Sequence, residues 1–233
     1  MKRYIVEAII IALGLTLLGV NIKSGFEKFA NKDRKVTVKG LAEREVMANK
    51  ITWPIVSKEL GDYLPALYNN INSTNTAIIN FLKSNGISDN EISVNPPKVV
   101  DLNSNIYSSN TRGYRYNITS VITVTSSQVA KVREIISKQG ELLKQGIAIV
   151  DGDYENRISY EYTDFSAIKP EMMKEAISNA QKTAKQFAEN SESKLGKIQT
   201  ASQGQFSIQD RDSNTPYIKD IRVVTTVVYS LED

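Results

Sequence analysis

Near the N-terminus, residues 4–22 form a run of 19 residues that is apolar except for Glu7, Thr16 and Asn21. A helix of this length rises about 28 Å, which matches the hydrocarbon core of one bilayer. A water-exposed chain could accommodate such a run only by burying it, so this segment constrains the fold more than any other. We predict that residues 1–22 form a single transmembrane helix that anchors the chain.

A cleavable signal peptide is the main alternative to an anchor, because Lys2 and Arg3 precede an apolar run. However, no small-residue cleavage pattern follows the run, and no cysteine is present for lipid attachment. A helix buried inside a globular domain is a further alternative. The orientation also stays open: two basic residues precede the run and five follow it closely, so the positive-inside rule alone places the domain in the cytoplasm.

The charge of the chain is concentrated beside this predicted helix. Of the 29 basic and 26 acidic residues, seven basic and three acidic residues precede Val36, which leaves 22 and 23 in the rest of the chain. The remainder is therefore close to neutral, which argues against a nucleic-acid partner. We predict that residues 23–35 form a basic juxtamembrane linker that favours anionic lipid headgroups.

The sequence contains no histidine and no cysteine. This excludes a Ser-His-Asp triad, a cysteine nucleophile, haem ligation by histidine and an ordinary zinc site. A carboxylate pair, a Ser-Lys dyad and a metal site made of oxygen ligands remain possible. We expect a protein that is not an enzyme, with no catalytic, cofactor-binding or metal-binding residues.

No linker rich in Pro, Gly or Ser divides residues 36–233, so we predict one α+β domain with a mixed or antiparallel sheet. Apolar spacings of three and four predict about three helices, at residues 62–85, 128–145 and after Pro170, with the second loosened at Gly140 and the first ended by Gly86. Pro54 and Pro96-Pro97 predict edges or bulges, since proline has no N–H for a ladder. Strands are predicted at residues 36–40, 50–60, 92–100, 114–125, 147–150, 157–162, 197–207 and 221–231.

Three stretches of the chain carry short motifs. The first is Val36-Thr37-Val38-Lys39-Gly40 with Glu43 and Val46, and the second is Leu82-Lys83, Gly86-Ile87 and Glu91-Ile92. The third is Glu175-Ala176, Ala180, Lys182, Ala184 and Ala188 followed by Lys194-Leu195-Gly196-Lys197-Ile198. In order and spacing, these stretches resemble the SIMPL-domain family of bacterial envelope proteins. Two positions depart from the family pattern. Gln181 replaces a usual arginine, and Glu192 stands near the position of an expected glycine, so the end of the long helix is expected to differ.

The resemblance implies export beyond the inner membrane, no established catalytic residues, a homo-oligomer and a role in envelope stress tolerance. One family member forms a large ring-like, channel-like assembly. The leading hypothesis is therefore a single-pass protein of the inner (cytoplasmic) membrane, whose domain lies on the periplasmic side as an oligomeric assembly or interaction module. The alternative is a periplasmic protein that binds a small ligand or peptide between helix and sheet, with the ligand unknown. A hydrolase without histidine is a third hypothesis.

Two short patterns have both a chemical and an ordinary structural interpretation. Ser191 and Lys194 have the spacing of a Ser-Lys dyad, but no companion motif accompanies them, so a solvated helix end is expected. Asp151-Gly152-Asp153 with Glu155 and Asn156 offers oxygen ligands for calcium. This segment lacks the length and the closing glutamate of an EF-hand, so a polar turn is expected.

Other patterns concern surfaces. Ala176, Ala180, Ala184 and Ala188 predict close packing of a helix on its own sheet, with a subunit contact as the alternative. Tyr154, Tyr160, Tyr162 and Phe165 offer a binding surface, although alternation favours an ordinary strand. Asn72 and Asn117 match the glycosylation pattern, which matters only in a eukaryotic secretory pathway. Residues 221–231 contain no proline, and they form either an exposed edge that pairs with another chain or a central strand.

Overall fold

The computed structural model describes residues 2–31, 34–104, 113–150 and 155–232, and within the first helix it describes the side chains of residues 10–23 and 25. Helices and antiparallel sheets are both present, which confirms the predicted α+β class. The chain divides into two compact units. The first comprises Met1–Arg44, Ser166–Ile208 and Asp220–Asp233, and the second comprises Glu45–Phe165 and Gln209–Lys219. Because the segments of the two units alternate along the chain, no linker marks the division in the sequence.

Helix α1 spans Lys2–Asn31 and so continues through most of the segment predicted as a linker. Thirty residues of helix are about 45 Å long. Its large apolar side chains from Ile10 to Ile22 are 51–65% exposed. For α1, the described side chains are those of residues 10–23 and 25. Within the part of the chain that the structure describes, no helix is both long enough and apolar enough to cross a membrane.

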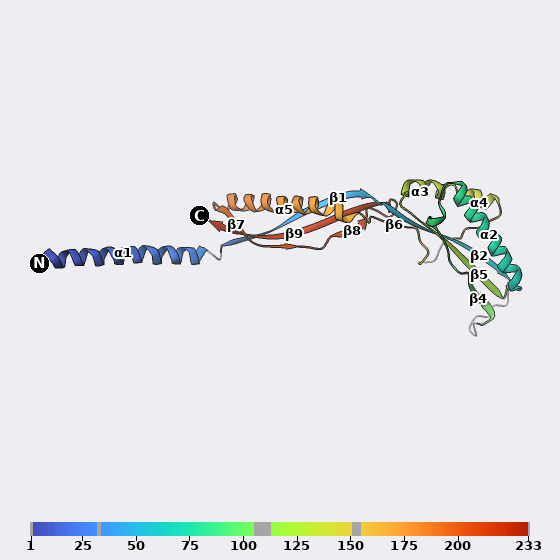
Figure 1. The fold of residues 1–233 in the computed structure, drawn as a ribbon, viewed down its shortest axis with the longest axis horizontal. Coiled ribbons are helices and arrows are strands. Elements are labelled where there is room, and N and C mark those ends of the chain that lie inside the picture. The colour runs from blue at the N-terminus through green and yellow to red at the C-terminus, as the bar shows by residue number, and fades with distance from the viewer. Residues whose placement is uncertain (1, 32–33, 105–112, 151–154, 233) are drawn as a thin grey trace. The chain divides into compact units, whose positions relative to one another are not determined.

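The first unit contains a sheet in the order β1-β9-β7, formed by β1 (Lys35–Met47), β9 (Ile218–Glu232) and β7 (Lys194–Gln203), with β8 (Ser207–Asp210) also paired to β9. Helix α5 (Phe165–Asn190) runs along β1 and β9 (Figure 1). Strand β9 has neighbours on both sides, so the hypothesis that residues 221–231 form an exposed edge is wrong. The apolar residues of this strand are explained by burial beneath α5.

The core of the first unit depends on small residues where α5 meets the sheet. Ala176, Ala180, Ala184 and Ala188 are at most 2% exposed, which confirms the predicted packing of this stripe on its own sheet. Val36 and Val38 of β1 and Val227 and Tyr229 of β9 complete the cluster around Ala180 and Ala184. A Cβ atom added at Gly40 would lie only 1.8 Å from the carbonyl oxygen of Ala176. The backbones of β1 and α5 therefore approach too closely for any side chain at this position.

The second unit contains a five-stranded antiparallel sheet with helices on one face (Figure 1). The strand order is β3-β5-β2-β6, and β4 also pairs with β5. The strands are β2 (Lys50–Gly61), β3 (Ile92–Val94), β4 (Lys98–Asp101), β5 (Tyr116–Ser126) and β6 (Ser159–Glu161). The helices are α2 (Leu64–Ser84), α3 (Val129–Ser137) and α4 (Gly140–Lys144), with short 3-10 turns at Asp89–Glu91 and Leu102–Ser104. The buried core joins Ile51, Trp53 and Ile55 of β2 and Ile122 and Val124 of β5 to Ile78, Phe81, Leu82, Val132, Ile135 and Leu142 of the helices.

Several elements differ from those predicted. The helix expected over residues 128–145 is divided into α3 and α4 at Gly140. Helix α5 begins before Pro170 rather than after it, and the proline is its sixth residue, so the missing N–H removes only one bond near the helix start. The strand expected at residues 147–150 is reduced to a single bridge between Val150 and Val56. Pro96-Pro97 separates β3 from β4, and both pair with β5, as expected for an interrupted edge.

Candidate functional site

Pro54 lies in the middle of β2 and interrupts the ladder on one side only. On one side, β2 pairs with β5 along its length, and Pro54 is opposite Thr123. On the other side, β6 pairs only as far as Thr52, and the next contact is the bridge between Val56 and Val150. Strand β2 is therefore central in the sheet, whereas Pro54 predicted an edge or a bulge. Among the described residues, no strand pairs with Pro54 on the side of β6.

The backbone of Pro54 directs its polar groups into this gap. The carbonyl oxygen of Val121 accepts a hydrogen bond from the N–H of Asn95 on the far side of β5, so the backbone groups of Val121 are directed away from β2. Val56 is opposite Val121, so its backbone N–H and carbonyl groups are directed away from β5. The direction alternates from one residue to the next along a strand, so the carbonyl group of Pro54, two residues before Val56, is directed the same way. The N–H of Val150 donates to the oxygen of Val56 at 3.0 Å. Among the described residues, no hydrogen bond to the carbonyl oxygen of Pro54 is found.

A pocket of about 400 Å³ opens at this gap. Its walls come from Trp53 and Pro54 of β2, from Ile136 and Gln139 at the end of α3, and from residues 149–150 and 156–158. Trp53 is only 2% exposed, so the indole belongs to the core and contributes an inner wall. Proline has no N–H to donate, so the segment of the chain beside β2 can separate from it at Pro54 without the loss of a hydrogen bond from this residue.

The lining combines apolar surface with a few polar groups. Three isoleucines, the proline and the tryptophan supply the apolar part, and the polar part comes from the amides of Gln139 and Asn156 and the guanidinium of Arg157. Among the lining residues that the structure describes, none carries a carboxylate. Small-molecule sites commonly have this size and this mixture of surfaces.

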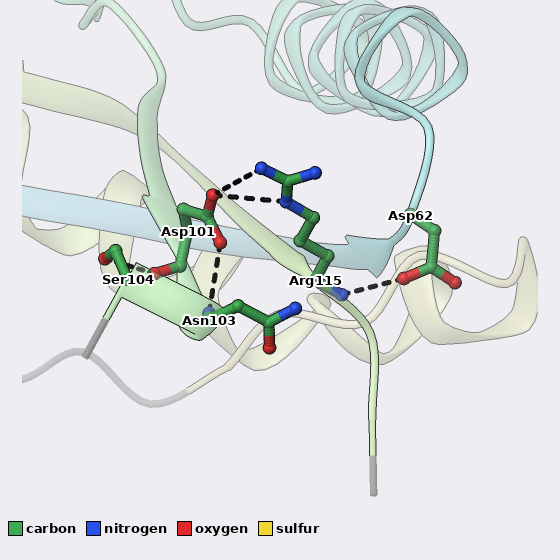
Figure 2. A network of polar contacts seen from close by, with 5 residues as sticks. All are labelled: Asp62, Asp101, Asn103, Ser104 and Arg115. Carbon is green, nitrogen blue, oxygen red and sulfur yellow. Dashed lines mark hydrogen bonds and ion pairs between the residues drawn. The ribbon is translucent and has the colours of Figure 1, made fainter. Parts of the chain in front are cut away.

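A cluster of polar contacts joins Asp62, which directly follows β2, to Asp101 and Arg115 (Figure 2). The guanidinium of Arg115 donates to Oδ2 of Asp101 through Nε and Nη2, at 3.2 and 3.1 Å. Oδ1 of Asp101 accepts from the N–H of Asn103, and the N–H of Arg115 donates to Oδ1 of Asp62 at 2.8 Å. The hydrogen bonds from Arg115 lower the pKa of Asp101. The groups satisfy one another and tie β4 and β5 to the start of α2, so this cluster is a structural clamp.

Ser191 and Lys194, which have the spacing of a Ser-Lys dyad, lie at and just beyond the end of α5. Oγ of Ser191 donates to the carbonyl oxygen of Ala188 at 3.1 Å, and Lys194 begins β7 opposite Glu232. For the calcium hypothesis, residues 151–154 lie outside the described residues. Within residues 2–31, 34–104, 113–150 and 155–232, no group of three or more acidic side chains is placed to hold a metal ion.

The aromatic residues that were considered as an alternative binding surface lie in different settings. Tyr154 lies outside the described residues, whereas Tyr160 packs edge-on against Tyr217, with ring centroids 6.0 Å apart. The guanidinium of Arg133 lies 3.4 Å from the centroid of the Tyr217 ring, and burial raises the pKa of Tyr160. Tyr160 is therefore a packing residue of the second unit. Sequence reasoning missed its partners because they lie far from it along the chain.

The two predicted glycosylation positions are placed differently. Asn72 is exposed on α2, whereas Asn117 is half-buried in β5, with its Oδ1 enclosed and without a partner among the described residues. Sequence reasoning also missed the pocket. Its only local signal was Pro54, which indicated a break in pairing, while the other walls are brought together by the fold.

Together, the two units define an α+β protein with one sheet in each unit and a pocket beside β2. The SIMPL family model, described as a protein of unknown function (DUF541), matches residues 36–229. This match covers most of the chain, so the protein belongs to the SIMPL family, as its motifs predicted. Among curated proteins, none matches this chain.

Proposed function

We propose that this protein is a single-pass, membrane-anchored component of the bacterial cell envelope, whose domain acts without catalysis as an interaction or assembly module on the periplasmic side. The observation that carries the proposal is the apolar character of the N-terminal helix around most of its circumference. Eight large apolar side chains between Ile10 and Ile22 are each at least half exposed. A helix that is apolar on nearly all sides needs a surrounding phase that is itself apolar.

The polar side chains within this helix also suit a membrane. Oγ1 of Thr16 donates to the carbonyl oxygen of Ala12, and Nδ2 of Asn21 donates to that of Leu17, both at 2.8 Å. These bonds satisfy the polar groups on the helix itself, which lowers the cost of removing them from water. A protein groove would cover one face, whereas a bilayer covers every face.

The remaining parts of the proposal rest on composition and family membership. The absence of histidine and cysteine removes the commonest catalytic groups, and the neutral charge balance after residue 35 argues against nucleic acid as a partner. Family resemblance supports export, homo-oligomerisation and a role in envelope stress tolerance. We propose that the chains self-associate, but not by pairing of β9 with another chain, because β9 is central in its sheet.

Membrane extraction tests the anchor. We expect the full chain to remain in the membrane pellet after alkaline carbonate treatment, to dissolve in detergent, and to have a mass that includes residues 1–22. Replacing Leu13 and Leu17 with lysine should release it, because each charge costs about 2.5–3.5 kcal/mol at the centre of a membrane helix. The matched variants with alanine at both positions should stay in the pellet. A mature chain that begins after residue 22 would contradict the proposal.

Protease accessibility tests the orientation separately. Protease added to intact spheroplasts should digest the chain after residue 35 if the domain is periplasmic. Complete protection, with digestion only after lysis, would instead place the domain in the cytoplasm. Sedimentation of the detergent-extracted protein tests self-association, and a monomer at all concentrations would argue against it.

A second candidate function is binding of a small ligand, favoured specifically by the pocket at Pro54. Thermal unfolding in the presence of metabolite libraries tests this candidate, because a ligand that binds only the folded state raises the melting temperature once its concentration exceeds its Kd. A pocket with no ligand would leave the melting temperature unchanged with every compound.

A further inference from the structure

We propose that two copies of this chain join by antiparallel pairing of the outer edges of their β1 strands, about a two-fold axis at Leu41. The inference rests on the self-association proposed above and names its surface. Because the paired strands run in opposite directions, two copies anchored in one membrane would pair with β1 lying along its surface. The backbone of β1, its exposed side chains and the position of α5 each support this pairing.

Strand β1 presents a backbone edge on the side away from β9. The carbonyl oxygen of Arg34 accepts from the N–H of Leu231, and the N–H of Ala48 donates to the carbonyl oxygen of Tyr217. The backbone groups of even-numbered residues are therefore directed toward β9, and those of odd-numbered residues are directed outward. In the described part of the chain, β9 is the only strand paired with β1. Thirteen residues without a proline thus form an edge that can pair with another strand.

The exposed side chains along this edge have a charge pattern that is complementary to itself. In chain order they are Lys35, Thr37, Lys39, Leu41 and Glu43. In an antiparallel pair centred on Leu41, Lys39 of each copy lies opposite Glu43 of the other, and the two leucines lie opposite each other. Opposite charges at such positions stabilise a sheet, whereas like charges destabilise it. Centring the pair on Lys39 would instead place two lysines opposite each other.

The groups at these positions are able to bind a second copy. Lys39 has no ion pair among the described residues. Glu43 lies 3.4 Å from Arg222, but its side chain is 59% exposed, so it can contact a second cation. At the axis, Nδ2 of Asn179 donates to the carbonyl oxygen of Leu41 at 2.8 Å. A carbonyl oxygen has two lone pairs, so it can also accept the N–H of Leu41 from the second copy.

The position of α5 fits the same arrangement. Residues paired across an antiparallel sheet share one face, so the two copies of α5 would cover the same face of the joined sheet. Each α5 packs on both β1 and β9. The two helix axes would therefore lie two strand spacings apart, which is about 10 Å and within the range for packed helices.

An exposed aromatic side chain lies on the flank of α5 that would face the second copy. Asn179 and Phe187 each directly precede a buried alanine, so both lie on the same flank of the helix. The hydrogen bond from Asn179 to Leu41 places this flank over the outer edge of β1. Phe187 is 60% exposed, and the second α5 would cover it.

The absence of cysteine allows a direct test by cross-linking the full chain in detergent micelles. At the axis, the two Cα atoms of residue 41 would lie about 5.5 Å apart. Leu41→Cys should therefore be joined into a dimer by a short bismaleimide. Thr37→Cys is the matched control, exposed on the same face of the same strand. Its two Cα atoms would lie about 26 Å apart, so it should remain uncross-linked.

Exchange of charges tests the register. Lys39→Glu places like charges opposite each other at two points of the dimer, so the dissociation constant measured by sedimentation should rise by about tenfold or more. Adding Glu43→Lys restores opposite charges and should recover much of the loss. Lys58→Glu changes an exposed lysine of the second unit and should associate as the unchanged protein does. Circular dichroism should show the same folded spectrum for each variant.

The results separate this inference from self-association in general. If the chain associates but Leu41→Cys and Thr37→Cys are cross-linked equally, or if the exchange of charges does not restore association, this inference fails and self-association through another surface stands. If the chain sediments as a monomer at all concentrations and neither cysteine variant is cross-linked, both proposals fail.

Discussion

At the scale of single residues, three helices end at a residue with a left-handed backbone conformation, which is glycine in two cases and glutamate in the third. Gly86, Gly146 and Glu192 follow α2, α4 and α5 with positive φ angles of 82°, 80° and 53°. At the end of α5, the N–H of Ser193 donates to the carbonyl oxygen of Ala188 at 2.9 Å, which is the bond expected for this type of helix end. Glu192 adopts a conformation that glycine adopts without a steric cost.

Replacing Glu192 with glycine should therefore stabilise the domain. The left-handed conformation costs a residue with a Cβ about 1–2 kcal/mol, and the greater freedom of glycine in the unfolded chain offsets part of this gain. We expect a net increase of about 1 kcal/mol in the free energy of unfolding, measured by chemical denaturation. Glu192→Ala keeps the Cβ and serves as the control, with little change expected. A destabilised Glu192→Gly variant would contradict this account of the helix end.

Two buried serines in the second unit should respond in opposite ways to the same substitution. Oγ of Ser120 donates to Oδ1 of Asn75 at 3.0 Å in a buried position, whereas Oγ of Ser57 is buried without a partner among the described residues. Ser120→Ala leaves the acceptor of Asn75 unsatisfied and should cost about 1–3 kcal/mol. Ser57→Ala removes an unsatisfied hydroxyl and should be neutral or stabilising. Equal losses in denaturant titrations of the two variants would refute this difference.

At the scale of elements, the contact between β1 and α5 depends on the absence of a side chain at Gly40. A Cβ there would lie 1.8 Å from the Ala176 oxygen and 2.8 Å from the Cβ of Ala180, so the helix would have to move. We expect Gly40→Ala to lower the free energy of unfolding by about 1–3 kcal/mol or more, as overpacked cores do. Gly140→Ala is a suitable control, because nothing lies within 4 Å of its added Cβ. Thermal unfolding followed by circular dichroism measures both.

The turn between β8 and β9 is held by one carboxylate. Asp212 accepts hydrogen bonds from the hydroxyl of Thr215 and from the N–H groups of Asn214 and Thr215. The bond from the Thr215 hydroxyl is the main cause that lowers the pKa of Asp212 from 3.8 to about 2. Since the folded state holds the ionised form, the stabilisation is complete above pH 4 and is lost as the pH falls from about 4 to 2.

An NMR titration of the carboxyl carbon of Asp212 should therefore show a midpoint near pH 2 in the folded protein. Thr215→Val removes the hydroxyl donor and should move the midpoint toward the ordinary value for aspartate. An unshifted midpoint in the unchanged protein would mean that these bonds do not form in solution.

At the scale of the whole molecule, the two compact units are interleaved along the chain, so neither can be excised as one segment without loss. Residues 45–165 contain most of the second unit but lack Gln209–Lys219. That segment carries Tyr217, which packs on Tyr160 and Arg133 and whose carbonyl oxygen accepts from the N–H of Ala48 at 2.8 Å.

A fragment of residues 45–165 should consequently melt at a lower temperature than residues 36–233, and Tyr217→Ala in the longer chain should reproduce part of the deficit. Removing a buried aromatic side chain costs up to about 3–5 kcal/mol, and a half-buried one costs less. Calorimetry of the three proteins measures the effect. A fragment as stable as the longer chain would show that the second unit does not need this segment.

Features that depend on residues close together along the chain could be predicted from the sequence. Residues 50–60, 114–125 and 221–231 were recognisable as strands, and Gly86 as the end of a helix, because side-chain periodicity and turn chemistry act over a few positions. The alanines of α5 predicted close packing of this helix on its sheet, and Gly40 belongs to one of the stretches that predicted the family. The departure at Glu192 was also visible, since the pattern asks there for a glycine.

Which strands are central, how the segments group into two units and where a pocket forms all depend on contacts between distant parts of the chain. The position of β9 depends on pairing with residues nearly 200 positions earlier, and the wall opposite Pro54 comes from residues about 100 positions later. Pairing over such distances depends on the chain as a whole rather than on local preference. A proline in a strand predicts a missing hydrogen bond, but whether the gap opens to solvent, to a neighbouring chain or to a ligand is decided by what the rest of the fold places beside it.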